Sequence, residues 1–372
     1  MAQTKIVDTI LPTTMVGSYP RPHWFRDQLD GRDVRVAFKN VGHEEAYADA
    51  TATVIRDQEE AGLDIVTDGQ MSYDDYVGVI GSFCWYMYER IPGFDPAREP
   101  HPTEVGADGT TYDRVMTLMH DWGGVINSGP VSRGPIRLRD LYEIARPLTD
   151  RPMKVSVGAG PVNLAWHAYF KHYKNPQELC YALAPIFNAE MKDLVAAGAT
   201  YLQLEDLGAW LPLFTGDDAD YEWIKDVIGK CCEGVDAKIG WHFCFGNAWG
   251  NDILSANFPN GYQTVLPHLW DTPGIDEFVL DYANREMAGI EFLANLPEDK
   301  SVQAGVLDIR SMMIESPEQV AARARMVLEH VPADRVTLST DCGMKPLPRM
   351  VAKLKLKALV DGAKIVRDEV AG

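Results

Sequence analysis

The chain has 372 residues, of which 46% are hydrophobic and 24% charged, and its formal net charge is −19 at pH 7. This composition predicts a globular protein with a large core, and the acidic charge argues against nucleic-acid binding, which needs a basic surface. No apolar stretch is long enough to span a membrane, the N-terminus shows no apolar signal segment, and six cysteines are too few for a disulfide framework. We therefore expect a cytoplasmic location.

Short β-branched runs alternate with longer amphipathic segments along the chain. Eight strands alternating with helices predict an α/β fold, a single (β/α)8 TIM barrel that forms one domain over residues 1–372. The predicted strands are 13–17, 64–67, 153–158, 201–204, 238–243, 278–280, 302–306 and 336–339, and the predicted helices are 44–61, 176–197, 221–232, 284–296, 317–330 and 346–370.

Residues 77–149 do not follow this alternation. The segment is rich in proline, glycine and aromatic residues. We expect an insertion after the second strand, built as a hairpin and a lid, and a second small domain is the alternative.

Polar residues follow almost every predicted strand. Reactive groups of a barrel come from the carboxyl ends of its strands, so these residues predict a catalytic mouth, although any one of them could be an ordinary loop residue. They include Ser18, Tyr19, Gln70, Glu205, Asp206, His242, Cys244, Asp281, Arg310, Asp341 and Cys342.

Two of these strand ends carry a candidate metal site. His242 and Cys244 are two residues apart, so on a strand they point to the same side, and Cys342 ends another strand. Thiolate and imidazole ligands suit Zn²⁺, and three protein ligands leave one position open for chemistry. A closed, structural zinc is the less favoured alternative, because its ligands usually come from closely spaced cysteine pairs.

Five motifs carry a resemblance to a known family: residues 13–20, 58–69, 203–206, 242–244 and 341–345. With them the chain resembles, over nearly its whole length, the catalytic barrel of the cobalamin-independent methionine synthase superfamily. The resemblance implies a catalytic zinc on His242, Cys244 and Cys342, with Asp281 in the place of an acidic fourth ligand. It also implies that a zinc-bound thiol reacts as a thiolate with an electrophilic carbon.

Two departures from the family pattern bear on the substrate. Gln70 stands where methionine synthases have a glutamate that holds the ammonium of homocysteine, and Arg310 stands where they have a histidine. A neutral amide suits an ammonium poorly and arginine suits an anion, so a thiol without an amine is favoured. The chain then resembles the epoxyalkane:coenzyme M transferases, in which the thiolate of coenzyme M opens a small epoxide to a hydroxyalkyl thioether. The alternative is a short methionine synthase that methylates homocysteine.

On this interpretation Arg310 and Lys345 neutralise the anionic tail, and Ser18 and Gln70 lie near the thiol. The alternative for Arg310 is a salt bridge to Asp308 or Asp341. Opening an epoxide leaves an alkoxide that needs a proton. The candidates for this catalytic role are Tyr19, Tyr73, His167, Glu205 and Asp206.

An apolar pocket for a small electrophile is also expected, with ordinary core packing as the alternative for each aromatic residue; the candidates are Trp85, Trp166, Phe243, Phe245 and Trp249. Two other classes remain open: a zinc-free decarboxylase related to uroporphyrinogen decarboxylases, which share the fold, and a non-enzymatic protein that binds zinc or thiols. A homo-oligomer is also left open.

Overall fold

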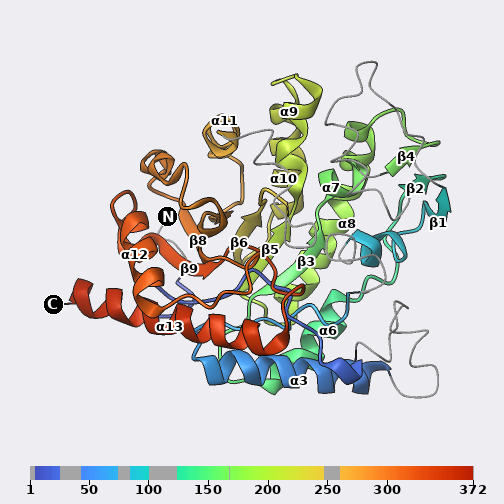
Figure 1. The fold of residues 1–372 in the computed structure, drawn as a ribbon. Coiled ribbons are helices and arrows are strands. Elements are labelled where there is room, and N and C mark those ends of the chain that lie inside the picture. Colours follow the sequence, from blue (N-terminus) through green and yellow to red (C-terminus); the bar gives the residue numbers. More distant parts are fainter. Residues whose placement is uncertain are drawn as a thin grey trace.

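A six-stranded parallel sheet forms the centre of the computed structural model, which describes residues 5–25, 43–73, 84–99, 124–166, 168–246 and 260–371. Its strands follow one another in the order β3-β5-β6-β7-β8-β9, with helices outside (Figure 1). All six predicted strands from 153 onward are present, with ends shifted by one or two residues. They are β3 (Val155–Ala159), β5 (Tyr201–Glu205), β6 (Lys238–His242), β7 (Glu277–Asp281), β8 (Ser301–Leu307) and β9 (Val336–Thr340).

The two predicted N-terminal strands appear as isolated bridges that extend this sheet. Thr13 pairs in parallel with Leu338 of β9, and Val66 pairs in parallel with Met153 just before β3. The N–H of Ile65 donates to the carbonyl of Thr13 at 3.1 Å, which joins the two segments. Backbone hydrogen bonds therefore run from β9 through residues 13 and 65–66 to the start of β3.

Long amphipathic helices cover the outside of the sheet, as the spacing of apolar residues predicts. In α12, Ser316 and Gln319 form a reciprocal capping box, which fixes where the helix starts. Figure 1 shows α3 and α13 side by side, and Arg349 of α13 pairs with Asp57 of α3 at 2.6 Å. The helices are α3 (His43–Ala61), α6 (Leu138–Ala145), α7 (Pro161–Trp166), α8 (Pro176–Ala196), α9 (Leu211–Thr215), α10 (Asp220–Cys232), α11 (Gly261–Leu269), α12 (Pro317–Leu328) and α13 (Arg349–Ala371). Within the described residues, no helix combines the length and apolarity that a membrane crossing requires.

The predicted helix 284–296 is wrong. The structure has two 3-10 helices there, η3 (Ala283–Arg285) and η4 (Ile290–Asn295). Glu286, Met287 and Gly289 between them have φ angles of 52°, 63° and 79°. Left-handed residues cannot continue a right-handed helix, so the apolar spacing alone was misleading. Three further 3-10 helices are η1 (Arg146–Leu148), η2 (Leu207–Trp210) and η5 (Ala333–Arg335).

The described part of segment 77–149 contributes to a second, smaller sheet. Its strands β1 (Phe94–Glu99) and β2 (Gly124–Asn127) pair antiparallel, and β2 pairs in parallel with β4 (Ala168–Phe170). This sheet lies away from the central one, at the edge of the molecule in Figure 1. Residues 77–83 and 100–123 of this segment, in which the hairpin and lid are expected, lie outside the described residues.

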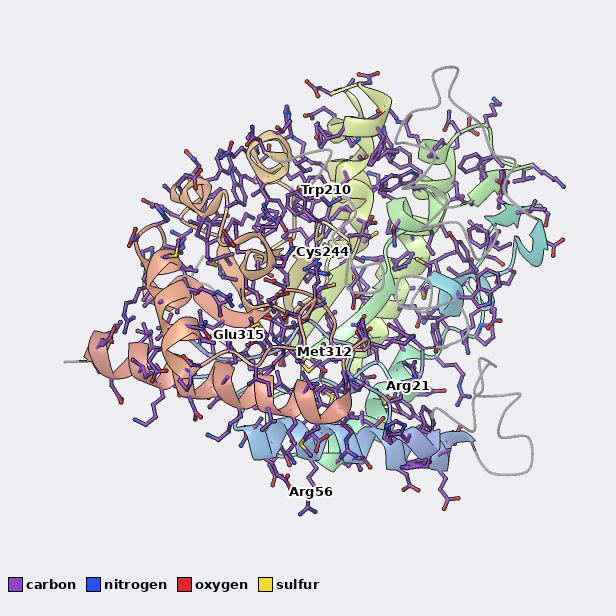
Figure 2. The ribbon with its side chains drawn as sticks, in the orientation of Figure 1. Arg21, Arg56, Trp210, Cys244, Met312 and Glu315 are labelled. Atoms are coloured by element: carbon purple, nitrogen blue, oxygen red, sulfur yellow. The ribbon has the colours of Figure 1, made fainter. Side chains whose placement is uncertain are left out.

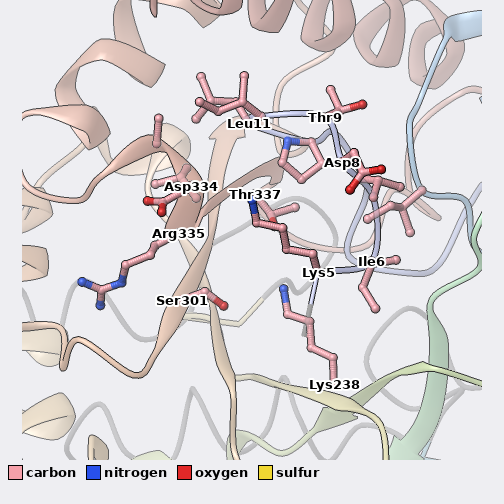
Figure 3. Close-up of a pocket in the computed structure, with 16 residues that line it drawn as sticks. Lys5, Ile6, Asp8, Thr9, Leu11, Lys238, Ser301, Asp334, Arg335 and Thr337 are labelled. Carbon is pink, nitrogen blue, oxygen red and sulfur yellow. The ribbon is translucent and has the colours of Figure 1, made fainter. Parts of the chain in front are cut away.

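A cavity of about 120 Å³ lies at the amino end of the central sheet (Figure 3). Lys5 and Leu11 of the N-terminal segment line it together with Lys238, Ser301 and Val336, the first residues of β6, β8 and β9. Lys238 already pairs with the buried Glu277 at 2.6 Å. The amino end of such a sheet serves stability, so we place the chemistry at the opposite, carboxyl end.

Candidate active site

Three soft ligands meet at the carboxyl end of the central sheet. His242 is the last residue of β6, Cys244 follows two residues later, and Cys342 comes after β9. The two sulfurs are 3.6 Å apart, and Cys342 Sγ lies 3.9 Å from His242 Nε2. All three ligand atoms lie within 4.8 Å of one another. The structure thus brings together the three residues that the sequence singled out, deep inside the fold, where Figure 2 labels Cys244 near Trp210.

These distances fit zinc. Two sulfurs bound tetrahedrally at about 2.3 Å from one zinc lie roughly 3.8 Å apart, close to the separation found. His242 Nδ1 lies 3.0 Å from the carbonyl oxygen of Val279, so Nδ1 carries the proton and Nε2 is free to bind metal. A hydrogen bond from Cys244, opposed by burial and reinforced by His242, holds the pKa of the Cys342 thiol well below its usual value. A thiolate is the form that binds a metal.

Asp281, implied as a fourth ligand, is not part of this group within the described residues. Its side chain is fully buried and both oxygens are engaged. Tyr262 donates to Oδ1, while the N–H of Phe245 (3.4 Å) and the guanidinium of Arg310 (3.1 Å) donate to Oδ2. The carboxylate is therefore tied to its own neighbours, and among the described residues the group that could hold a metal consists of His242, Cys244 and Cys342.

Arg310, predicted as an anion clamp, lies between two buried carboxylates. Its Nη2 donates to Asp281 and to the carbonyl of Gly246, and its Nη1 lies 3.9 Å from Asp341. Nε and Nη1 are buried and find no hydrogen-bond partner in the part of the chain that the structure describes. Two carboxylates balance the single positive charge of this guanidinium, so it brings no excess charge for an anionic substrate.

Glu205, at the end of β5, forms a second polar group next to the three candidate ligands. Its Oε1 accepts hydrogen bonds from Ser156 Oγ (2.6 Å), Gln203 Nε2 (3.5 Å) and Gln70 Nε2. Glu205 pairs in register with His242 of β6, which places the carboxylate beside the three ligands. Burial raises the pKa of Glu205, and the charge of His242 lowers it in part.

The backbone around Gln70 is shaped for this contact. Gln70 has φ 54°, and the turn is tied by its N–H to Asp68 Oδ1 at 2.9 Å. A Cβ on Gly17 would lie 2.5 Å from Gln70 Nε2, so only glycine at position 17 allows the amide to reach Glu205.

Asp206 and Asp341 hold the backbone instead of facing the site. Asp206 accepts from the backbone N–H groups of Val162, Asn163 and Gly208 at 2.8–2.9 Å. Asp341 likewise accepts from three consecutive backbone N–H groups, residues 282–284. Both carboxylates cap 3-10 turns that follow strands, a positioning role that the sequence pattern alone did not distinguish from catalysis.

Of the remaining predicted residues, Ser18 and Lys345 lie near Cys342, whereas Tyr19 does not. Tyr19 is fully buried, and its nearest charged groups are Asp57 and Arg349 on the outer helices, so its phenol faces away from the cysteines. Ser18 is half-buried, and its Oγ would lie 2.0 Å from a Cβ on Gly343, next to Cys342. Lys345 is half-buried in the same loop as Cys342. His167 lies outside the described residues.

The aromatic residues expected to line a pocket pack mainly into the core. Phe243 and Phe245 are fully buried and contact Trp210 and Tyr262. Trp85 is buried against Tyr88, Trp166 packs on Phe214, and Trp249 lies outside the described residues.

Three residues around Glu205 were not predicted as site residues: Lys154, Ser156 and Gln203, the last of which begins the motif 203–206. Lys154 and Ser156 alternate around β3, and Gln203 precedes Glu205 by two residues on β5. The two-residue spacing was a signal that Lys154 shares a face of the sheet with Ser156, and Gln203 with Glu205. Because this face is buried, polar side chains on it are unusual and could have marked the site.

Comparison with known proteins places the chain in a family. A family model described as the catalytic domain of cobalamin-independent synthase matches residues 11–90 and 110–365. Methionine synthases from Sulfolobus acidocaldarius and Saccharolobus solfataricus are each 31% identical to the chain. The first alignment covers 97% of this chain and 94% of the relative, and the second covers 97% and 96%.

Solved structures agree. A B12-independent methionine synthase from Shewanella sp. W3-18-1, in complex with selenomethionine, superposes with a TM-score of 0.81 at 27% identity, covering 98% of this chain and 99% of that one. A putative vitamin-B12 independent methionine synthase from Listeria monocytogenes shares the fold with a TM-score of 0.66 at 18% identity, over 96% and 99% of the two chains. The chain therefore belongs to the cobalamin-independent methionine synthase family, whose zinc-dependent enzymes transfer a methyl or alkyl group to a thiol.

Proposed function

We propose that the protein transfers a methyl group to the thiol of homocysteine, with zinc held by His242, Cys244 and Cys342. The observation that carries the proposal is the arrangement of Glu205. Three donors occupy Oε1, and among the described residues none reaches Oε2. An accessible carboxylate oxygen that has no partner among the described residues suits a substrate ammonium, which donates charge-assisted hydrogen bonds. Homocysteine has such an ammonium, whereas coenzyme M does not.

The residues divide the work between the two ends of the substrate. When bound, Zn²⁺ lowers the pKa of a coordinated thiol, so that the thiol reacts as a thiolate near neutral pH. Glu205 holds the amine end, and Ser156, Gln70 and Gln203 keep Glu205 in place. The sulfur attacks the methyl carbon of the donor; the new C–S bond forms as the bond to the leaving atom breaks, and the electron pair leaves with the donor. Holding both ends aligns the sulfur for this displacement.

The contacts of Gln70 and Arg310 reverse the preference for coenzyme M that they suggested in the sequence. The neutral Gln70 does not leave the site without a negative charge. Its amide donates to Glu205, and Glu205 supplies the charge. Arg310 is balanced by Asp281 and Asp341. A sulfonate would therefore meet a carboxylate at Glu205 and a neutralised arginine. We accordingly place epoxide opening with coenzyme M second.

The relatives support the same choice. Those named above are methionine synthases, and the Shewanella enzyme was solved with selenomethionine, a ligand that carries an amine and a carboxylate. For this chain the likeness supports a substrate with an amino-acid end.

We also propose that the central sheet closes into a (β/α)8 barrel, a single domain with an insertion inside residues 77–149. The hydrogen bonds of residues 13 and 65–66 between β9 and β3 support closure. The family model leaves residues 91–109 unmatched, which supports the insertion.

Calorimetric titration of the zinc-loaded protein tests the substrate. We expect homocysteine to bind at least tenfold more tightly than γ-mercaptobutyrate, which has the same thiol and carboxylate but no amine. Coenzyme M should bind more weakly than homocysteine. Tighter binding of coenzyme M, with consumption of epoxypropane, would replace methyl transfer by epoxide opening.

A further inference from the structure

A buried lysine lies inside the central sheet, and the chemistry described so far does not use it. Lys154 precedes β3, and its side chain is 1% exposed. Its Nζ donates to Gln203 Oε1 of β5 at 2.6 Å and to Gln303 Oε1 of β8 at 2.7 Å. The lysine therefore bridges two strands through amide oxygens.

The first of these bonds fixes the direction of an amide. A glutamine side chain has one accepting and one donating end, and an amine donor selects the oxygen. With its oxygen on Lys154, Gln203 must present Nε2 on the other side, where it donates to the carbonyl of Val16 (2.8 Å) and to Glu205 Oε1 (3.5 Å). Lys154 and the carbonyl of Val16 thus together determine which end of Gln203 faces Glu205.

The lysine is not required to neutralise the nearest buried acid on this face. Glu277 already accepts hydrogen bonds from Lys238 (2.6 Å), Thr337 (3.2 Å) and Tyr201. Burial lowers the pKa of Lys154 to about 7, and an amine in either protonation state still has donors for both amide oxygens. Since burying an amine is costly, an apolar residue would serve better if this position only filled the core.

We propose that Lys154 is a positioning residue for amine recognition: through Gln203 it keeps Glu205 Oε1 bound to the protein and leaves Oε2 for the substrate ammonium. The inference rests on the proposed use of Glu205 to bind homocysteine. If the Gln203 amide turns over, its oxygen faces the carboxylate and repels it, and Glu205 loses its fixed direction.

The test compares two thiols on the zinc-loaded full-length protein. The measured quantity is the ratio of the affinities for homocysteine and γ-mercaptobutyrate, determined by calorimetry. We expect Lys154→Met to lower this ratio at least fivefold while the zinc content stays unchanged. Gln203→Met should lower it similarly, and it decides the question if the lysine variant does not fold. A general loss of structure would weaken both thiols together and leave the ratio unchanged.

Gln303→Met is the matched control, because Gln303 is the other amide partner of Lys154 and makes no bond to Glu205. We expect this variant to keep the wild-type ratio. In a Glu205→Gln background, Lys154→Met should have no further effect on the ratio. A wild-type ratio in both Lys154→Met and Gln203→Met, or an equal fall in Gln303→Met, would overturn the inference while the proposed function stands. A wild-type protein with no preference for homocysteine would overturn both.

Discussion

Replacing Glu205 by glutamine is the sharpest test of the site. The substitution keeps the size of the side chain and removes the negative charge that we assign to ammonium binding. Ser156 can still donate to a side-chain oxygen, so the surrounding structure should persist. The change therefore separates charge from shape.

The burial of Glu205 sets the expected size of the effect. The side chain is 7% exposed, so bulk water and salt screen its charge only weakly. Two unit charges 4 Å apart interact by about 4 kcal/mol at an effective dielectric constant of 20, which is a ceiling because both ions lose hydration. A hydrogen bond to a charged group contributes about 1.5–3 kcal/mol net. We therefore expect Glu205→Gln to weaken homocysteine binding roughly 10- to 100-fold.

Calorimetry on the zinc-loaded variant measures this loss, with γ-mercaptobutyrate as the reference ligand. The affinity for γ-mercaptobutyrate should change less than about threefold, because this thiol has no ammonium and loses no charge-assisted hydrogen bond when Glu205 is replaced. Glu190→Gln is the matched control, because Glu190 is also buried but pairs with Arg133 at 2.7 Å. Equal weakening of both thiols by Glu205→Gln, or unchanged homocysteine binding, would refute the assignment.

Three further results are expected. Cys342→Ser should lose zinc and activity together, whereas Cys231→Ser, a buried helix position in α10, should keep both; metal analysis that finds full zinc in the Cys342 variant would refute the ligand set. Arg310→Met should lower the free energy of unfolding in urea by about 3 kcal/mol or more, because it leaves Asp281 buried without its cation; a selective loss of coenzyme M binding at unchanged stability would show an anion clamp instead. Burial raises the pKa of Glu205, so its carboxyl keeps a proton to higher pH than an ordinary glutamate. The ratio of the homocysteine affinity to the γ-mercaptobutyrate affinity should therefore rise with pH as Glu205 ionises. A ratio that stays flat from about pH 5 to 8 would contradict this expectation.

The sequence by itself determined the features that depend on local spacing. Short β-branched runs predicted the strands from 153 onward, and amphipathic spacing predicted α8 and α12. The two-residue interval between His242 and Cys244 predicted that the two side chains meet, and they do, although Cys244 lies two residues beyond the end of β6. The sequence-based prediction of a helix at 284–296 is wrong, because left-handed backbone at Glu286 and Met287 overrides an apolar spacing typical of a helix.

Only the tertiary structure decided which polar groups meet. Gln70 and Glu205 are 135 residues apart in the chain, yet their contact changes the meaning of the glutamine from a missing charge to a donor that holds one. Arg310 was equally ambiguous until Asp281 and Asp341 were found beside it. The physical reason is that a charge inside a protein is defined by its partners, since desolvation makes an unpaired one costly, and those partners come from strands that only the folded sheet brings together.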